Sequence, residues 1–275
     1  MTFVATAQVP AYGPGPGITL AFQNLDLTYT TKHQRVTALH NVNLDIANGK
    51  FVALVGPSGC GKSTLLHLAA GALTPTAGQV FLGSTPVTGL STGIGYVFQT
   101  DSLLPWKSIA DNIALPLVLQ RRSKDEIRER VEKWLVRTNL KAFANAYPAH
   151  LSGGMRKRVA IAQSLIYEPA VLLMDEPLSA LDAQTRMMMG DELLRMWEGT
   201  GTTVVFVTHD LPEAIYLADE IVVMAARPGR VKSRYDVDLA RPRTPGAGRQ
   251  HREYHDLYAT VYNDLREEVM ATYEP

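Results

Sequence analysis

The stretch FVALVGPSGCGKS, residues 51–63, decides the fold of this chain. Its first five residues form a short, continuous apolar run, which is typical of a β-strand buried on both faces. The segment from Gly56 to Ser63 then matches the pattern G-x-x-x-x-G-K-[ST], and a helical stretch, KSTLLHLAAG, follows. A strand, a Gly-rich loop and a helix in this order are the context in which the pattern binds phosphate, whereas a plain Gly-rich turn is the less favoured interpretation.

The residue types of this loop suit the phosphates of a nucleotide. Glycines allow backbone N–H groups to turn inward around an anion. The Lys62 ammonium adds positive charge at the β- and γ-phosphates, and the Ser63 hydroxyl is a ligand for Mg²⁺. The residues predicted to bind the nucleotide here are Gly56, Pro57, Ser58, Gly59, Cys60, Gly61, Lys62, Ser63 and Thr64.

Working outward from the loop, three later apolar runs have the same form as the first. They are VLLMDE (171–176), TTVVFVTH (202–209) and EIVVMAA (220–226), and a helical stretch follows each. The middle of the chain is therefore predicted to be α/β with a largely parallel core sheet. From Ile18 to Ile46 apolar and polar residues alternate, which predicts an N-terminal antiparallel β subdomain.

Two further segments depart from this α/β pattern. Between Gln99 and Tyr167 apolar strands are absent and helical patterns dominate, which predicts an inserted helical subdomain at about residues 100–167. SKDEIRERVEKWLVRT, for example, opens with a capping box of Ser123 and Glu126. Residues 1–16 are rich in Pro and Gly and predict a flexible tail, and residues 241–275 predict a linker and an amphipathic helix. The apolar face of that helix comprises Tyr254, Leu257, Tyr258, Val261, Leu265 and Val269.

Composition excludes several classes of protein. Lys plus Arg and Asp plus Glu are 27 each, so bulk charge favours neither nucleic acid nor anionic lipid as a partner. The longest apolar runs are far shorter than the roughly 20 residues of a membrane span. The N-terminus lacks the basic start and apolar run of a secretion signal. A single cysteine, Cys60, excludes an internal disulfide framework and favours a reducing, cytosolic compartment.

Polar side chains follow two of the predicted core strands. Asp175 and Glu176 end the run VLLMDE, and a carboxylate there, beside a phosphate loop, is placed to act as an outer-shell acceptor for Mg²⁺. We assign this role to Asp175, and we expect Glu176 to take a proton from an attacking water. His209 ends the next buried strand, at the same sheet edge, and could hydrogen-bond a γ-phosphate. A solvated acidic strand end and a structural histidine are the alternatives.

Two other residues are candidates by position. Gln99 follows the strand-like YVF at the entrance to the helical insert, where its neutral amide could contact Mg²⁺ or water. Tyr29 ends an N-terminal strand and could stack on a purine, although tyrosine in such a pattern also serves as packing. Cys60 lies within the phosphate loop, where oriented amides could lower its pKa. We therefore expect thiol alkylation to block nucleotide hydrolysis and ATP to protect.

The segment HLSGGMRKRVAIAQSL, residues 150–165, places Ser-Gly-Gly directly before a basic, half-apolar helix. A hydroxyl, bare backbone amides and a helix N-terminus together form an anion site. No nucleophile, base or metal ligand lies close by in the sequence, so the segment is predicted to be one half of a phosphate site. We expect the basic run MRKR to lie on the side of the helix that faces the anion and the chain that supplies the other half of the site.

Taken in order, these motifs resemble the nucleotide-binding subunit of ATP-binding cassette (ABC) transporters. GPSGCGKS resembles the Walker A loop, LSGGM the signature and VLLMDE the Walker B strand. Gln99 resembles the Q-loop residue, SALD at Ser179–Asp182 the D-loop and His209 the H-loop residue. The resemblance extends from about Ile18 to Val237, implies the ABC-ATPase form of the P-loop NTPase fold, and makes residues 17–240 an ABC ATP-binding domain. Met155 replaces the more common Gln of the signature.

The resemblance implies a head-to-tail dimer with a second copy of the chain. Ser152, Gly153 and Gly154 of one copy would then cap the γ-phosphate of ATP held by the Walker loop of the other, and Asp182 would reach across the interface. The family also implies Mg²⁺-dependent ATP hydrolysis, with Glu176, His209, Lys62 and Gln99 as the catalytic residues. The metal would lie near Ser63, Gln99 and Asp175.

A finer resemblance is to importers of nitrate, sulfonate, taurine and similar solutes. It is carried by LLPWKSIADNIALPL, LSGGMRKRVAIAQSL and AARPGRV. Such systems pair this subunit with transmembrane permease subunits and an extracytoplasmic solute-binding protein, which implies a peripheral location at the cytoplasmic face of the inner membrane. Leu103, Leu104 and Trp106 could receive a permease helix or pack the insert. A soluble, non-transport ATPase of the same superfamily and an exporter cassette are the alternatives.

Overall fold

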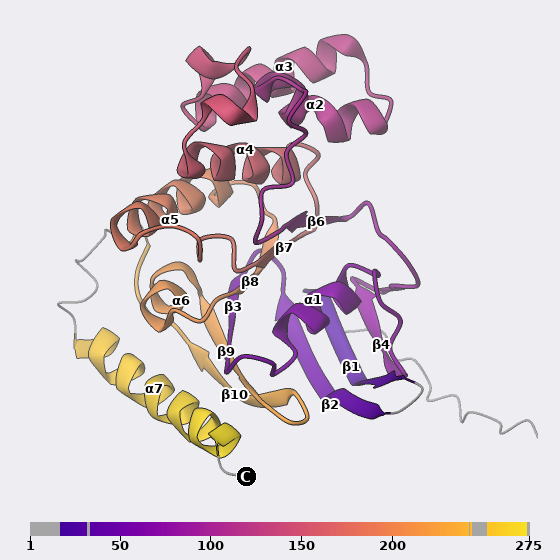
Figure 1. The fold of residues 1–275 in the computed structure, drawn as a ribbon, viewed down its shortest axis with the longest axis vertical. Helices are drawn as coiled ribbons and strands as arrows, with labels where there is room; N and C mark the ends of the chain where they lie inside the picture. The colour runs from indigo at the N-terminus through magenta and orange to yellow at the C-terminus, as the bar shows by residue number, and fades with distance from the viewer. Residues whose placement is uncertain (1–16, 32–33, 242, 244–251, 274–275) are drawn as a thin grey trace, which may run out of the picture.

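The computed structural model describes residues 17–31, 34–241, 243 and 252–273 of the chain. The predicted tail at residues 1–16 and most of the predicted linker lie outside the described residues. Two β-sheets and a layer of helices make up the described part (Figure 1).

The larger sheet has six strands in the order β10-β9-β3-β8-β7-β6. Five of them pair in parallel, and β10 at the edge pairs antiparallel with β9. The predicted, mostly parallel core sheet is therefore confirmed. The strands are β3 (Phe51–Val55), β6 (Ile94–Val97), β7 (Val171–Asp175), β8 (Thr203–Val207), β9 (Glu220–Ala225) and β10 (Arg230–Asp236).

The smaller sheet is antiparallel, as the N-terminal alternation predicts. Its order is β2-β1-β4-β5, and β1 pairs along its length with β2. Helix α1 (Lys62–Ala69) follows the phosphate loop and packs between the two sheets, so that the loop lies where they meet. The strands are β1 (Ile18–Thr30), β2 (Arg35–Ala47), β4 (Ala77–Leu82) and β5 (Thr85–Pro86).

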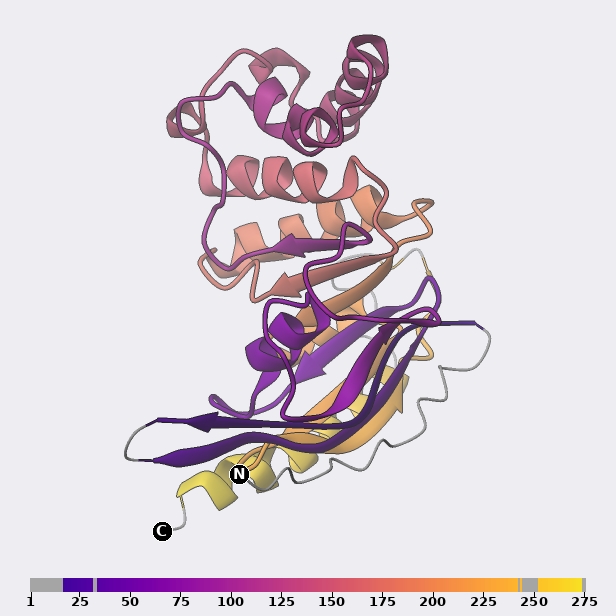
Figure 2. The same ribbon diagram turned by 90° about the vertical axis from the view of Figure 1, so that its right-hand side faces the viewer.

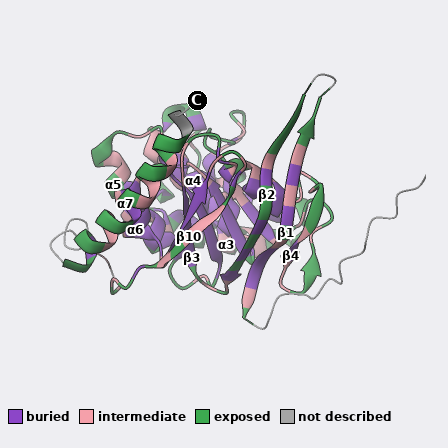
Figure 3. Cartoon of the chain, turned by 90° about the horizontal axis from the view of Figure 1, so that it is seen from below, coloured by how far each residue is buried: buried purple, intermediate pink, exposed green. Residues whose placement is uncertain are grey.

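The strands of the larger sheet separate two hydrophobic cores. In β3, Phe51, Ala53 and Val55 belong to the core under the helices, whereas Val52 and Leu54 belong to the core shared with α1 and the smaller sheet. This alternation follows from the period-2 geometry of a strand, and it is why the run FVALV is apolar at every position. Figure 3 shows these central strands buried, while the carboxyl end of β1 and the start of β2 are exposed.

Helices cover the other face of the larger sheet and extend away from it. Helices α4 and α5 lie on the sheet, and α2 and α3 form a further layer beyond α4 (Figure 2). Ser123 caps α3 by accepting a hydrogen bond from the backbone N–H of Glu126 at 3.2 Å. The helices are α2 (Ile109–Leu119), α3 (Lys124–Arg137), α4 (Gly153–Leu165), α5 (Ala183–Trp197), α6 (Leu211–Leu217) and α7 (Arg252–Tyr273), with 3₁₀ turns at Lys141–Phe143 and Pro148–His150.

Leu103, Leu104 and Trp106, at the entrance to the helical insert, do not form one exposed surface. Leu103 is buried in the core under the helices and Leu104 is partly buried, whereas Trp106 is 71% exposed. The prediction that all three form an exposed receptor surface is therefore wrong for Leu103. Leu103 packs into the core under the helices. The adjacent backbone is held by the buried Asn112 of α2, which accepts a hydrogen bond from the N–H of Leu104 at 2.7 Å and donates to its carbonyl at 3.1 Å.

Helix α7 packs against α6 and β9 at the far edge of the larger sheet. Tyr254 and Val261 are buried, but Val269 is 38% exposed, so the predicted apolar face packs only over its first part. Lys232 of β10 fixes the second part through ion pairs with Asp264 at 2.8 Å and Glu268 at 3.1 Å. Among the described residues, no helix is both long and apolar enough to span a membrane.

Candidate active site

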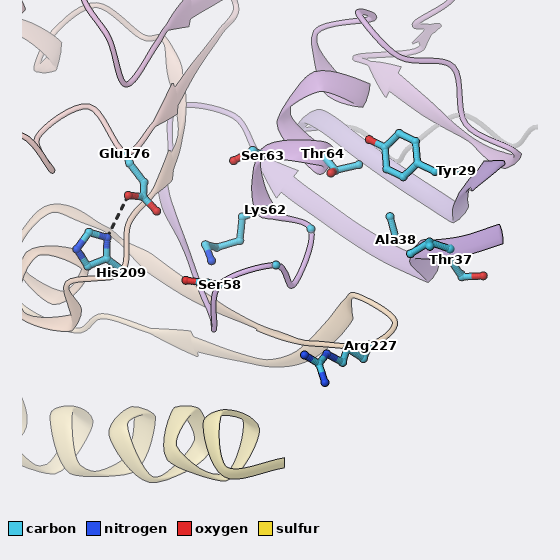
Figure 4. A pocket seen from close by; sticks show the side chains of 13 residues that line it. Tyr29, Thr37, Ala38, Ser58, Lys62, Ser63, Thr64, Glu176, His209 and Arg227 are labelled. Atoms are coloured by element: carbon cyan, nitrogen blue, oxygen red, sulfur yellow. Dashed lines mark hydrogen bonds and ion pairs between the residues drawn. The ribbon is translucent and has the colours of Figure 1, made fainter. Parts of the chain in front are cut away.

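A cavity of about 810 Å³ opens where the two sheets meet (Figure 4). Four parts of the chain line it: the paired ends of β1 and β2, the phosphate loop, the carboxyl ends of β7 and β8, and the turn between β9 and β10. Several polar side chains, among them Lys62, Ser63, Glu176 and His209, face it from different walls. The lining residues are Tyr29, Val36, Thr37, Ala38, Ser58, Gly59, Gly61, Lys62, Ser63, Thr64, Glu176, His209 and Arg227.

The phosphate loop takes a conformation that only glycine suits at its two ends. Gly61 caps α1 with a φ of 91°, and a Cβ on Gly56 would lie 2.6 Å from the carbonyl oxygen of Met224. The ammonium of Lys62 folds back over the loop and donates to the carbonyls of Gly56 at 2.8 Å and Pro57 at 3.0 Å. Of the predicted loop residues, Gly56, Pro57 and Cys60 do not line the cavity.

Ser63 and Asp175 meet, as the sequence predicts for a magnesium site. The Ser63 hydroxyl donates to Oδ1 of Asp175 at 2.9 Å, which brings together a hydroxyl and a carboxylate oxygen, the donors that Mg²⁺ prefers. The Tyr96 hydroxyl donates to Oδ2 of the same carboxylate at 3.4 Å. Burial, and then the charge of Asp175, raises the pKa of Tyr96 above its usual value, so the phenol remains a donor. These oxygens therefore fit the predicted metal.

Glu176 and His209 form a pair at the cavity wall. Nδ1 of His209 lies 3.1 Å from Oε2 of Glu176, and Figure 4 shows the two side chains pointing toward one another. Glu176 has a φ of 44°, in the left-handed region that a side chain rarely adopts, and its N–H donates to the carbonyl of Val207 at 3.1 Å. Non-glycine residues held in this region cluster at functional sites.

Gln99 lies beside the cavity and does not line it. Its amide Nε2 donates to the hydroxyl of Ser179 at 3.3 Å, and that hydroxyl donates to the carbonyl of Glu176 at 2.8 Å. The structure thus connects Gln99 to Glu176 through Ser179, but it does not bring Gln99 together with Ser63 and Asp175.

The Ser-Gly-Gly segment lies outside the cavity of its own chain. Ser152 is exposed and caps α4 by accepting from the N–H of Met155 at 3.3 Å. A Cβ on Gly153 would meet Leu181 at 3.6 Å, which places the segment beside the turn that carries Asp182. Asp182 is exposed and caps α5, and its hydrogen bonds from Thr185 lower the pKa of its carboxyl group. Ser152, Gly153, Gly154 and Asp182 are thus separate from Lys62 and Glu176.

The basic run after Ser-Gly-Gly does not face an anion as a whole. Lys157 is buried, and its ammonium donates to the carbonyls of Phe98 at 3.0 Å and Gln99 at 2.8 Å. Asp101 pairs with both Lys157 at 3.4 Å and Arg156 at 2.7 Å. Burial lowers the pKa of Lys157, and the charge of Asp101 opposes that effect. The prediction for MRKR is therefore wrong for Lys157, because the apolar side of α4 turns this cation inward.

Cys60 does not provide the activated thiol that its position in the loop predicted. The side chain is fully buried in the core shared by α1 and the smaller sheet. Burial raises the pKa of the thiol, and the nearby charge of Lys62 offsets only part of this effect. Cys60 does not line the cavity, and its Sγ lies in this core, 3.6 Å from the ammonium of Lys62.

We accordingly expect iodoacetamide to leave Cys60 unmodified in the native protein at pH 8 and to modify it fully in denaturant. Intact-mass spectrometry over a time course measures both reactions, because the chain has only this cysteine. The thiolate is the reactive form, and both the raised pKa and the lack of access suppress it. Rapid labelling of the native protein, with protection by ATP, would show that Cys60 is an accessible, activated thiol and that its buried placement is wrong.

Sequence reasoning missed one wall of the cavity. Ala38 of β2 and Arg227 of the β9–β10 turn both line it. The turn is fixed to β2 because the N–H of Gly229 donates to the carbonyl of Ala38 at 3.0 Å. A Cβ on Gly229 would lie 2.2 Å from the carbonyl oxygen of Cys60, so the turn also packs on the phosphate loop. The phrase ARPGRV signalled a hairpin, but nothing in it indicated contact with the loop.

Comparison with known proteins defines the class. Residues 39–179, which reach from β2 to Ser179, match the family model of the ABC transporter. The chain belongs to this family, which confirms the resemblance and the predicted fold, and it is an ATP-hydrolysing cassette.

Individual relatives show how far the similarity extends along the chain. A taurine import ATP-binding protein of Yersinia pestis is 44% identical over 76% of this chain and 82% of its own. An uncharacterized ABC transporter ATP-binding protein of Methanocaldococcus jannaschii is 42% identical over 92% of this chain and 93% of its own. The solved dimeric structure of an ATP-binding cassette bound to ADP and Pi superposes with a TM-score of 0.69. That cassette is 35% identical, and the match covers 80% of this chain and 100% of that one.

Proposed function

We propose that the chain is the ATP-hydrolysing subunit of an ABC importer for a small anion or organic solute such as nitrate, a sulfonate or taurine. The observation that carries this proposal is the taurine import relative, whose similarity spans most of both chains. The cavity supports it, because the phosphate loop and the Glu176–His209 pair are both in place.

In the proposed mechanism the cavity binds ATP. Tyr29 stacks on the base, and the loop amides with Lys62 hold the phosphates. Glu176 takes the proton of the attacking water, while His209 donates a hydrogen bond to the γ-phosphate. Ser63 and Asp175 would hold Mg²⁺, which neutralises charge on the phosphates when bound. Gln99 is linked to the carbonyl of Glu176 through the hydroxyl of Ser179 and takes part in turnover from that position.

The second half of the site comes from another copy of the chain. Ser152, Gly153 and Gly154 offer a helix N-terminus with its positive partial charge, yet they do not line the cavity of their own chain. In a head-to-tail dimer they cap the γ-phosphate of the partner's ATP, and Asp182 lies at the same interface. The dimeric cassette among the solved relatives supports this arrangement.

The remaining partners follow from the importer assignment. Transmembrane permease subunits bind the insert near the exposed Trp106, and the chain is peripheral at the cytoplasmic face of the inner membrane. An extracytoplasmic protein delivers the solute to the permease, so the solute itself does not contact this chain.

Affinity purification tests the transport assignment. The chain is tagged in its native cell, membranes are solubilised in mild detergent, and stoichiometric partners are identified by mass spectrometry. Equal amounts of a polytopic membrane protein support transport, and the companion binding protein is then screened against sulfonates, taurine and nitrate. A chain found wholly with ribosomes or DNA repair factors would overturn transport and leave the ATPase assignment intact.

A further inference from the structure

The imidazole ring of His209 makes few contacts. Its side chain is 58% exposed, and among the described residues it forms one hydrogen bond, to Glu176. A ring with so few contacts takes its position from the backbone that carries it. The contacts of the flanking residues, Thr208 and Asp210, therefore decide how His209 faces Glu176.

Glu213, on the first turn of α6, contacts both flanking residues. Its Oε2 accepts a hydrogen bond from the hydroxyl of Thr208, and its N–H donates to Oδ1 of Asp210 at 3.0 Å. The N–H of Asp210 donates back to the hydroxyl of Thr208 at 3.0 Å, which closes a ring of three hydrogen bonds around the position of His209. Arg186 of α5 pairs with Oδ2 of Asp210 at 2.9 Å and braces the ring from outside.

Glu213 occupies this place at a cost to stability. Its Oε1 is buried and has no hydrogen-bond partner among the described residues, although the residue as a whole is partly exposed. Burial raises the pKa of Glu213 to about 7; the Thr208 bond and Arg186 lower it, whereas Asp210 and Glu176 raise it. Because the pKa is raised on folding, ionised Glu213 destabilises the fold as the pH rises through 7.

We propose that Glu213 is a positioning residue for ATP hydrolysis, which fixes the backbone on both sides of His209 and so holds the ring against Glu176. Glu213 does not line the cavity and makes no contact with nucleotide in this assignment. The proposal rests on the proposed role of His209 in turnover.

Matched substitutions separate position from stability. Glu213→Met and Thr208→Val each keep the side-chain shape but remove one partner of the shared hydrogen bond. Each is expected to lower kcat about tenfold and to leave KM for ATP within about twofold, because the residues that line the cavity are untouched. The double variant is expected to be no worse than Thr208→Val alone, since Thr208→Val already removes the bond to Glu213 together with the one from the N–H of Asp210. Glu213→Gln and Thr208→Ser keep the bond and are expected to retain most of the turnover.

Thermal unfolding provides the structural control. Glu213→Gln removes the buried charge, so it is expected to have a higher Tm than the wild type at pH 8, and the difference shrinks as the pH falls toward 4.5, the ordinary value. A role in stability alone would make the Gln variant the more active enzyme as well as the more stable one.

The outcomes distinguish the proposals. Wild-type kcat in Glu213→Met or in Thr208→Val overturns the positioning role, and so does a loss of kcat that Glu213→Gln shares. If Glu213→Met does not fold, the Thr208 pair alone decides. His209→Ala is measured in the same assay: if it keeps wild-type turnover, the proposed role of His209 fails, whatever the Glu213 variants do.

Discussion

Glu176→Gln is expected to lower ATP turnover by about 10²- to 10⁴-fold and to leave ATP bound, because an amide cannot accept the proton of the attacking water. The substitution keeps the size of the side chain and an oxygen that can face Nδ1 of His209, now 3.1 Å from the carboxylate. Phosphate release under single-turnover conditions measures the effect. Size-exclusion chromatography with ATP and Mg²⁺ is expected to show an ATP-stable dimer of the variant.

The chain contains a matched control for this substitution. Glu168 also has a positive φ, of 57°, and forms an exposed ion pair with Arg130. Glu168→Gln therefore removes a carboxylate from the same kind of backbone at a residue that does not line the cavity, and it is expected to hydrolyse ATP like the wild type. If Glu176→Gln also keeps wild-type turnover, the assignment of the general base is wrong.

Two inactive variants of the chain are expected to restore activity when they are mixed. Lys62→Met removes the charge at the phosphates, and Gly153→Asp sets a negative charge where a γ-phosphate would lie. Each variant alone is expected to lose about 10²-fold or more in turnover. A Cβ at Gly153 meets only Leu181 and Arg156, at 3.6 Å and 3.9 Å, so we expect this variant to fold.

In a head-to-tail dimer the mixture contains one site with both an intact Lys62 and an intact Gly153. Half of the dimers in an equal mixture are mixed, and each has one intact site of two, so turnover is expected to recover to roughly a quarter of the wild-type value. Steady-state phosphate release after co-refolding or co-expression gives the result. Turnover that stays at the level of the single variants would place the Ser-Gly-Gly segment outside the site of the partner.

Local patterns predicted the phosphate loop and the core strands well, for a physical reason. A strand buried on both faces must be apolar at every position, and a loop around phosphate must carry Gly and Lys at fixed spacing. The meeting of Ser63 and Asp175 also followed from sequence, because the carboxyl ends of parallel strands share one sheet edge.

Other features depended on contacts between distant segments. Three of them follow from packing partners that lie far away in the chain. They are the burial of the Cys60 side chain, the inward direction of Lys157 and the burial of Leu103. Arg227 lines the cavity on a turn whose Gly229 hydrogen-bonds to Ala38 of β2. No sequence motif pointed to Glu213, because its contacts with Thr208 and Asp210 become visible only in the structure.

The two cores on either face of the larger sheet have a consequence for the cooperativity of unfolding. Because Phe51 and Val52 belong to different cores, neither core can melt without exposing one face of β3 to water. We therefore expect the antiparallel subdomain and the sheet under the helices to unfold together as one unit, although the sequence divides them into two patterns. A nucleotide bound at the end of β3 stabilises that whole unit. Binding at the loop is therefore expected to raise the free energy of unfolding of the smaller sheet as well.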